Sequence, residues 1–402
     1  SRHPRLGRWS RGLGDVYKRQ LYSPFALNSE DHTMPVPLLD LTRQYKPLRE
    51  EFRSVIDRVC DSQRFILGGE VEDFEREAAE ALGVAYAIGV SSGTDALLEA
   101  LMALDVGRGD EVVLPTFTFF ATAGVVARLG ATPVFVDVDP VDYCIDTVQL
   151  RERIGPRTKA VIPVHLFGQA ADMDAVMDAA GEVPVLEDCA QAWGADFNGR
   201  PVGSIGRMGA FSFFPSKNIG CFGDGGLITC SDEELFGRLR ELRVHGQAGV
   251  YEHPVVGGNF RIDALQAAVL RVKLPHVTGW IDGRRANADR YRELFADSKV
   301  ADSVQLPEAV PGRGHTFNQF VVRVPKRDEL RSHLLERGIG CAVYYPIPLH
   351  LQPCFADLGY GEGDLPVSEQ ASREVLALPV FPELTEAELA EVVGAVEDFY
   401  AG

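Results

Sequence analysis

The sequence predicts an α/β fold with a largely parallel central sheet, and three observations support this prediction. Short apolar runs alternate with segments of helical periodicity from about residue 37 onward. Turn-forming residues bound each of these runs. The chain has 402 residues, of which 46% are hydrophobic and 24% charged. That apolar content suits a globular chain with a large buried core.

The apolar runs are the predicted strands, and helical segments separate most of them. The runs cover residues 84–90, 111–114, 133–138, 160–166, 183–186, 208–214 and 226–230. Runs separated by helices point to parallel βαβ units. The last two runs have no helix between them, so we expect them to pair antiparallel. Before the first run, apolar residues at helical spacing between Leu48 and Val59 predict a helix with Pro47 in its first turn.

The second half of the chain has a different, α+β pattern. A long helical stretch over residues 263–295 is interrupted at Pro275 and is followed by a predicted strand at 319–324. A helix at 328–337, a Pro-rich loop at 345–353 and a terminal helix at 385–400 follow in turn. We therefore expect a large α/β domain over residues 34–270 and a smaller C-terminal α+β domain over residues 271–402.

Charge is distributed unevenly along the chain. The net charge is −18, yet the first twenty residues carry +5, which leaves −23 on the remainder. An acidic body gives no reason to bind nucleic acid or anionic lipid. The Arg-rich start lacks the apolar core of a secretory signal, and its segment GLGDVYKRQ resembles translated sequencing-adapter read-through. We expect residues 1–33 to be a disordered or artefactual extension.

Cysteine content and hydropathy indicate the expected compartment. The seven cysteines are scattered without a Cys-x-x-Cys pair, so neither a disulfide framework nor a metal site is expected. No window approaches 18 uninterrupted apolar residues, so we expect no membrane span. A reducing cytoplasm is the expected location.

Lys217 is the first candidate for chemistry. The chain has seven lysines, and Lys217 alone lies between an aromatic strand and a glycine-rich turn, in FSFFPSKNIGCFGDGG. Apolar surroundings lower the pKa of a lysine and make its amine a nucleophile. Taken alone, an exposed loop lysine is the commoner explanation.

Three further features favour a functional site. Gly93 and Thr94 open a helix directly after a strand, where free backbone N–H groups can bind a phosphate. Asp188 ends a buried strand, at the sheet edge where α/β proteins bind ligands. The aromatic run after residue 115 includes Phe119, whose ring could stack on a flat ligand. Together with Lys217 these groups match the needs of pyridoxal 5′-phosphate (PLP): a reactive lysine, an acid for the pyridinium nitrogen and a phosphate cradle.

The motifs resemble those of the DegT-type nucleotide-sugar aminotransferases, which have PLP fold type I. The resemblance covers residues 35–400, and its motifs occur in the family's order. They are SSGTDAL, PTFTFFAT, VDVDP, VIPVHLFGQ, LEDCAQAWGA, FSFFPSKNIGCFGDGG, RVHGQ, GGNFRIDALQAA and YYPIPLHLQ. The implied fold is a large domain with a mostly parallel mixed sheet plus the small C-terminal domain.

The resemblance also implies roles for individual residues. Lys217 would form the Schiff base, Asp188 would pair with the ring nitrogen and Gln191 would lie at the ring hydroxyl. Phe119 would stack on the ring, and the phosphate would be bound by Gly93, Thr94, Ser212 and, from the neighbouring subunit of a homodimer, Asn259. The implied positions near the substrate are His165, Glu187, Arg261, Tyr345 and His350.

The retained lysine makes transamination the expected reaction, because related sugar dehydratases carry histidine there. The resemblance is strongest to enzymes that aminate UDP-linked 3-keto hexuronates, with glutamate as the donor. dTDP-linked 3-keto or 4-keto 6-deoxysugars, another fold-type-I activity such as a desulfurase, and a non-catalytic PLP-binding regulatory protein are alternatives. A nicotinamide dehydrogenase is excluded, because no Gly-x-Gly-x-x-Gly links a strand to a helix.

Overall fold

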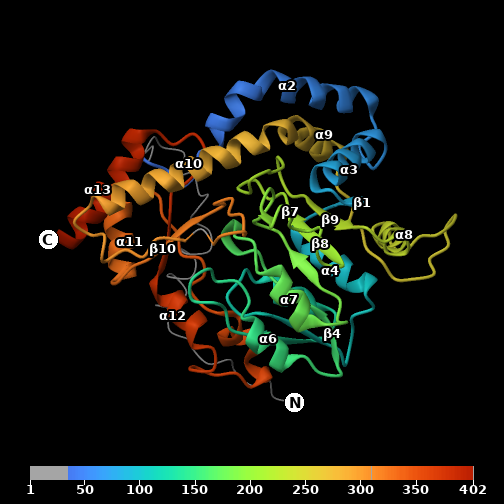
Figure 1. Ribbon diagram of the computed structural model, residues 1–402. Coiled ribbons are helices and arrows are strands. Elements are labelled where there is room, and N and C mark those ends of the chain that lie inside the picture. Colours follow the sequence, from blue (N-terminus) through green and yellow to red (C-terminus); the bar gives the residue numbers. More distant parts are fainter. Residues whose placement is uncertain (1–34, 309, 402) are drawn as a thin grey trace, which may run out of the picture.

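The computed structural model describes residues 35–308 and 310–401. Helices and strands alternate in the order that the sequence predicts, which confirms the α/β fold class (Figure 1). The expected N-terminal extension at residues 1–33 lies outside the described residues. Among the described residues, no helix has both the length and the apolar character needed to cross a bilayer.

The centre of the molecule is a mixed sheet whose strands run parallel with one exception. Two hydrogen-bonded groups, β1-β9-β8-β5 and β3-β2-β4, meet through parallel bridges of Val161 with Val185 and of Val164 with Asp188. Only β9 runs antiparallel to its neighbours, as predicted for the last two runs. The strands are β1 (Tyr86–Val90), β2 (Glu111–Pro115), β3 (Thr132–Val136), β4 (Thr158–Val161), β5 (Leu186–Asp188), β8 (Met208–Ser212) and β9 (Gly226–Cys230).

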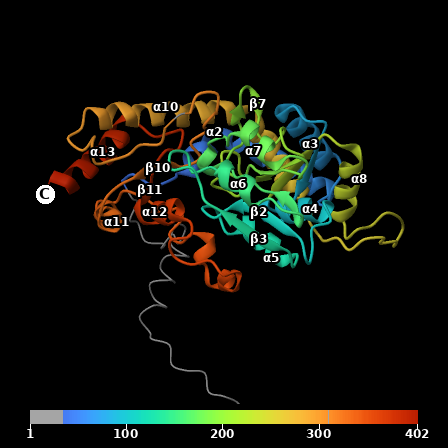
Figure 2. The same cartoon turned by 60° about the horizontal axis from the view of Figure 1, so that its bottom comes forward.

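Helices bury both faces of this sheet, which explains why its strands are apolar runs rather than alternating ones. One core cluster packs under α4 (Gly93–Ala103), α5 (Ala121–Arg128) and α8 (Glu233–Leu242). The other packs under α3 (Gly69–Leu82), α6 (Thr147–Arg153), α7 (Met173–Ala180) and α9 (Ala264–Lys273). Figure 2 shows α6 and α7 on one side of β2 and β3 and α5 on the other.

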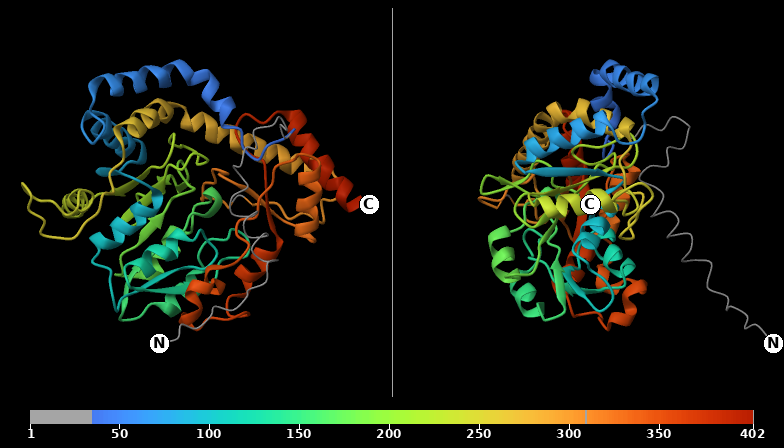
Figure 3. Two further views of the ribbon diagram at one scale, coloured as in Figure 1. Left: turned by 180° about the vertical axis from the view of Figure 1, so that it is seen from behind. Right: turned by 90° about the vertical axis from the view of Figure 1, so that its right-hand side faces the viewer.

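The C-terminal part has its own core. Many buried residues between Ala288 and Val396 form a separate cluster, joined by Val36 from the beginning of the described chain, whereas Leu349, Phe355 and Leu365 belong to the core under α4, α5 and α8. Its elements are α10 (Val277–Ala296), β10 (Phe320–Arg323), α11 (Arg327–Glu336), α12 (Pro366–Glu374), β11 (Val375–Leu378) and α13 (Glu386–Ala401). Figures 1 and 3 place α13 and α8 at opposite ends of the molecule. This cluster supports the proposed division near residue 270, which stays a prediction.

The structure differs from the predictions at two elements. Helix α2 (Leu41–Ser62) begins six residues before Pro47, because Asp40 caps it by accepting a hydrogen bond from the backbone N–H of Thr42. Pro47 is therefore inside the helix, where it removes the hydrogen bond to the carbonyl of Arg43, yet the helix continues through it. Strand β11 was not predicted as a strand, and it pairs antiparallel with β10. The helical break at Pro275 is present as a 3₁₀ turn, Leu274–His276, between α9 and α10.

Short elements complete the described chain. A two-residue hairpin joins β6 (Asp196–Phe197) to β7 (Arg200–Pro201). Further 3₁₀ turns are Leu166–Gly168, Leu349–Leu351 and Pro353–Leu358.

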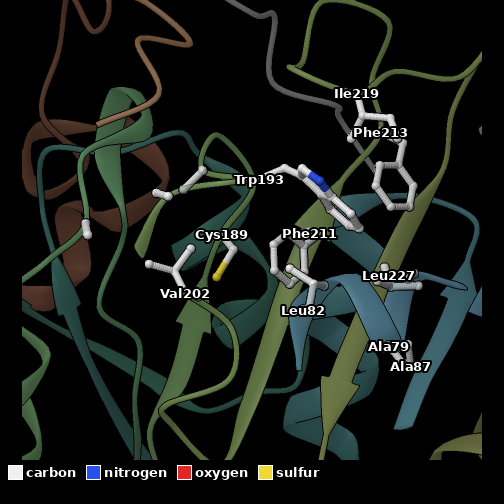
Figure 4. Packing of buried hydrophobic residues seen from close by; sticks show 14 of the residues in the cluster. Ala79, Leu82, Ala87, Cys189, Trp193, Val202, Phe211, Phe213, Ile219 and Leu227 are labelled. Carbon is white, nitrogen blue, oxygen red and sulfur yellow. The ribbon is translucent and has the colours of Figure 1, made fainter. Parts of the chain in front are cut away.

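An aromatic cluster supports the strand that leads to Lys217. Trp193 packs with its ring centroid 5.3 Å from that of Phe211 and 5.8 Å from that of Phe213. Figure 4 shows these rings on one face of the sheet, with Ile219 beyond Phe213. Phe213 and Ile219 are almost completely buried, so the chain on both sides of Lys217 is held by packing.

Candidate active site

The candidate residues meet at the carboxyl edge of the parallel strands. Asp188 ends β5 and pairs in parallel register with Ala210 of β8, two residues before Ser212. Ser212 in turn pairs with Gly226 at the start of β9, which lies opposite Val90 at the end of β1. Because parallel strands end at one edge, the turns after β1, β5 and β8 lie at the same edge of the sheet, where α/β proteins bind ligands.

The N-terminus of α4 forms an anion-binding cradle. Ser92 caps the helix by accepting a hydrogen bond from the backbone N–H of Asp95 at 3.0 Å. The N–H groups of Gly93 and Thr94 have no acceptor among the described residues. A Cβ on residue 93 would lie 2.6 Å from the Cβ of Ser212, so only glycine allows this close approach. The free N–H groups of Gly93 and Thr94, together with the hydroxyls of Ser92 and Ser212, fit a phosphate.

Lys217 lies in the loop between β8 and β9. The loop closes through the Lys217 N–H, which donates to the carbonyl of Phe214 at 2.9 Å, and through the Cys221 N–H, which donates to that of Phe213 at 2.8 Å. Lys273 supports it further, because its Nζ donates to the Gly220 carbonyl. Burial lowers the pKa of Lys217 to about 8. Its amine makes no ion pair with another described residue, so it is poised as a nucleophile.

Asp188 is almost completely buried, with 4% of its surface exposed. Its Oδ1 accepts a hydrogen bond from the Ala190 N–H at 3.1 Å, and its Oδ2 accepts one from the Thr122 hydroxyl at 2.9 Å. Burial raises the pKa of Asp188, while these hydrogen bonds and the nearby Lys217 oppose the rise. Such a carboxylate has a strong preference for a cationic partner.

Gln191, Tyr345 and Phe119 line the same region. Gln191 accepts a hydrogen bond from the Phe167 N–H at 2.6 Å and donates one to the Tyr345 hydroxyl at 3.1 Å. The ring centroids of Tyr345 and Phe119 are 6.3 Å apart. Phe119 is 58% exposed, which is unusual for a phenylalanine beside a buried strand end and leaves its ring free to stack on a ligand.

The structure does not bring Glu187 and His165 to an open substrate mouth, where the sequence analysis placed them. Both side chains are fully buried. Glu187 accepts hydrogen bonds from the N–H groups of Gly203, Ile205 and Gly206 and lies 3.0 Å from His165 Nε2. Its neighbours therefore satisfy the carboxylate, and we assign this pair a supporting role beneath the site.

His350 is likewise buried, with 1% of its surface exposed. Its Nδ1 lies 2.8 Å from the Thr116 hydroxyl, and its Nε2 lies 3.3 Å from Glu369 Oε1. Burial lowers its pKa against the opposing effect of Glu369. These contacts join the end of β2 to the loop after Tyr345, so His350 positions this loop.

Asn259 and Arg261 lie on the segment that runs past the end of β1. Arg261 forms a bridge with Val90, and the Ser91 N–H donates to the carbonyl of Phe260 at 2.7 Å. The buried Nε of Arg261 has no hydrogen-bond partner, and no described carboxylate lies within ion-pair distance of its guanidinium. Asn259 is exposed. A guanidinium without an ion pair among the described residues, on a segment that runs past the end of β1, suits an anionic ligand.

His165, Glu187 and Cys189 have ligand atoms within 4.8 Å of one another, but their chemistry does not fit a metal. His165 Nδ1 accepts a hydrogen bond from the Ala171 N–H at 3.0 Å, so the proton on Nε2 faces Glu187. Burial raises the pKa of the Cys189 thiol well above its usual range. A neutral thiol and a protonated Nε2 are not metal ligands.

Sequence reasoning did not single out Thr122, which contacts Asp188 directly. Its position was visible within the motif PTFTFFAT, but its partner was not, because the two residues are 66 positions apart.

The comparison with known proteins agrees with this site. Residues 46–397 match the DegT/DnrJ/EryC1/StrS aminotransferase family. The chain belongs to this family. Among its relatives, the pleiotropic regulatory protein of Geobacillus stearothermophilus is 50% identical over 91% of this chain and 99% of its own length.

The names of two further DegT-family relatives include a nucleotide-linked sugar. The UDP-N-acetyl-3-dehydro-α-D-glucosamine 3-aminotransferase of Acidithiobacillus ferrooxidans is 47% identical over 90% of this chain and 97% of its own length. The dTDP-3-amino-3,4,6-trideoxy-α-D-glucose transaminase of Streptomyces venezuelae is 43% identical over 93% of this chain and 98% of its own length.

Solved structures of DegT-family proteins share the fold. S. venezuelae DesV in complex with a ketimine intermediate has a TM-score of 0.87 and is 43% identical, over 90% of this chain and 98% of that one. NtdA from Bacillus subtilis with bound cofactor PMP has a TM-score of 0.84 and is 30% identical, over 92% and 86%. The expected DegT resemblance and fold type are confirmed.

The chain is a PLP-dependent transaminase, and its residues fit the cofactor. The open N–H groups at Gly93 and Thr94 suit the phosphate, and buried Asp188 suits a protonated ring nitrogen. Lys217, whose pKa is lowered to about 8 by burial, suits the aldehyde. The chemistry of each group matches the part of the cofactor that it would hold.

Proposed function

We propose that this sugar aminotransferase moves an amino group from glutamate to a nucleotide-linked 3-ketosugar, with a UDP-linked 3-keto hexuronate as the preferred substrate. The observation that carries the proposal is the convergence of Lys217, Asp188 and the α4 cradle at one sheet edge. A relative that acts on a UDP-linked 3-ketosugar supports C3 as the site of amination. A relative named for a dTDP-linked sugar keeps dTDP-3-keto-6-deoxysugars as the second candidate.

Each residue would have a distinct role in binding the cofactor or in catalysis. Bound PLP supplies an aldehyde that carries the amino group and a protonated ring that withdraws electrons. Lys217 Nζ would bind the aldehyde carbon and, once displaced by the incoming amine, carry a proton to and from the reacting carbon. Asp188 would hold the proton at the ring nitrogen. Gln191 would orient the ring at its hydroxyl, and Phe119 would cover one face of it.

A coupled assay with glutamate as donor tests the proposed function. UDP-linked 3-keto hexuronate, UDP-linked 3-keto-N-acetylglucosamine and dTDP-linked 3-keto and 4-keto 6-deoxysugars would be supplied separately. We expect the first to give the highest kcat/KM and the 4-ketosugars the lowest. Turnover with a 4-ketosugar alone would contradict amination at C3. Amino transfer to pyruvate or oxaloacetate without sugar turnover would contradict the sugar assignment as a whole.

Arg261 carries a prediction about the substrate. If its guanidinium binds the diphosphate or the sugar carboxylate, Arg261→Lys should raise KM for the ketosugar about tenfold, because one charge-assisted contact of about 1.4 kcal/mol is lost. Steady-state kinetics would measure KM for glutamate and for the sugar separately. Arg58→Lys is the matched control, since Arg58 pairs with Glu70 away from the site. Unchanged constants would place the anion contact elsewhere.

We also propose that the enzyme is a homodimer with shared sites. The loop over residues 246–258 extends from the body after α8 (Figure 1). Val250, Tyr251 and Val256 on this loop are 100%, 91% and 88% exposed. Apolar side chains on an extended loop indicate a contact surface, and Asn259 follows the loop directly. A second copy covering this loop would receive Asn259 at its own phosphate cradle.

Mixed dimers test the shared site. Lys217→Ala and Asn259→Asp subunits should each be inactive alone, whereas their heterodimer should recover about half of the wild-type activity. One of its two sites would combine an intact Lys217 with Asn259 of the partner subunit. The control pairs Lys217→Ala with Asp188→Asn subunits: both lesions act in their own subunit, so no activity should return. No recovery in a verified Lys217→Ala/Asn259→Asp heterodimer would assign Asn259 to its own subunit.

A further inference from the structure

The carboxylate of Asp188 is held from two separate elements. The Ala190 N–H, in the turn after β5, binds Oδ1 at 3.1 Å, and the Thr122 hydroxyl, on the first turn of α5, binds Oδ2 at 2.9 Å. Two hydrogen bonds on different oxygens fix the plane of the carboxylate. Each oxygen still has lone pairs available for a further donor.

The Thr122 hydroxyl has one proton and two acceptors within reach. The Asp188 carboxylate at 2.9 Å competes with the carbonyl of Phe119 at 3.2 Å. A carboxylate binds more strongly than a neutral carbonyl, and here it is also the nearer acceptor. The Thr118 hydroxyl lies 3.3 Å from that of Thr122 and can donate to it, which would strengthen the bond to Asp188.

Burial makes the hydrogen bond between Thr122 and Asp188 important. Thr122 and Asp188 are both buried, Thr122 completely, so water cannot replace a lost donor. Burial raises the pKa of Asp188, and the Thr122 hydroxyl is one of the few groups that oppose the rise. The competing explanation is that Thr122 only stabilises the start of α5 through the carbonyl of Phe119.

We propose that Thr122 is a positioning residue that aims the Asp188 carboxylate at the ring nitrogen of PLP and keeps it charged. The proposal rests on the proposed role of Asp188 and is independent of which sugar is the substrate. It assigns to α5 a function in cofactor binding, besides its packing against the sheet.

Thr122→Val removes the hydroxyl while keeping the shape of the side chain, and Thr122→Ser keeps the hydroxyl. The affinity of the cofactor-free protein for PLP would be measured between pH 5.5 and 9, together with the pH profile of the glutamate half-reaction. We expect Thr122→Val to weaken PLP binding about tenfold at pH 7 and to shift the Asp188-dependent part of the acid limb upward by about one pH unit, while the part set by Lys217 stays in place. The Asp188-dependent part of the loss arises because the carboxylate becomes protonated as pH falls, and without its donor this happens at higher pH. Thr122→Ser should stay within about twofold of the wild type.

Two controls separate positioning from folding. Thr229→Val removes the hydroxyl of another buried threonine, which donates to the Gly203 carbonyl, and should lower the melting temperature without moving the acid limb. In an Asp188→Asn background, Thr122→Val should cause no further loss of PLP affinity. The same comparison with Thr122→Ala serves if the valine variant does not fold.

Wild-type affinity and pH profile in Thr122→Val would overturn the proposal, as would a loss in Thr122→Ser equal to that in Thr122→Val. If Asp188→Asn itself left the affinity and the profiles unchanged, the assignment of Asp188 would fail instead. The two failures are therefore distinguishable.

Discussion

Lys217→Ala should abolish amino transfer and remove the visible absorbance of the bound cofactor. The side chain that binds the aldehyde and moves the proton is then absent, and no other described lysine lies in the loop between β8 and β9. Because burial lowers the pKa of Lys217 to about 8, the free amine at pH 7 is a few-hundred-fold more abundant than for an ordinary lysine, roughly 10% of the total. Because alanine can neither bind the aldehyde nor move the proton, the loss in kcat should exceed about three orders of magnitude.

Borohydride reduction followed by peptide mass analysis would check this prediction. In the wild type, the reduced cofactor should be attached to Lys217 alone, and in Lys217→Ala no adduct should form. Lys273→Met is the matched control, because burial lowers the pKa of Lys273 to about 8 as well, yet its Nζ donates to the Gly220 carbonyl. That variant should lose stability and keep the adduct. An adduct on another lysine of Lys217→Ala would refute the assignment.

The pH dependence of cofactor attachment follows from the same group. A lysine is nucleophilic only as the free amine, which predominates above its pKa. The rate at which PLP attaches to cofactor-free protein should therefore rise with pH, reach its half-maximum near pH 8 and level off above it, whereas an ordinary lysine would reach its half-maximum only above about pH 10.

Asp188→Asn should retain PLP with reduced affinity and lower kcat at least about a hundredfold. An amide carries no negative charge, so it cannot keep the ring nitrogen protonated, and the electron withdrawal that drives proton transfer is lost. Single-turnover absorbance with glutamate measures this step without the sugar.

Asp137→Asn is the control for burial. Asp137 is also buried, but it accepts hydrogen bonds from the N–H groups of Val367 and Ser368. Its replacement should lower the melting temperature and leave kcat of the folded protein unchanged. Near-wild-type turnover in Asp188→Asn would make Asp188 a structural residue.

The strands were predictable because a sheet covered on both faces requires uninterrupted apolar runs. Residues 226–230 form β9 as predicted, and the other runs contain or overlap their strands. The predicted ends of the strands are less accurate. The apolar run at 160–166 continues five residues beyond the end of β4 at Val161. The chain beyond β4 is still apolar because it pairs with β5 through the bridge of Val164 with Asp188. The long helix was read correctly, including its break at Pro275.

Local patterns could not locate contacts made by distant segments. Strand β11 follows α12 directly and pairs with β10, from Phe320↔Leu378 to Arg323↔Val375, so its partner lies more than 50 positions earlier in the chain. Helix α2 starts earlier than predicted because Asp40 caps it, which outweighs the effect of Pro47.

The sequence by itself determined the family, the cofactor and the residues that would hold it, since these depend on residue types in motifs along the chain. Lys217, Asp188, Gly93 and Gln191 converge at one edge because parallel strands end there. The tertiary structure decided which polar groups are available. It buries His165, Glu187 and His350 among their own hydrogen-bond partners, leaves Arg261 without an ion pair among the described residues and brings Thr122 to Asp188. Burial and hydrogen-bond saturation arise from packing between distant segments, and no local pattern encodes them.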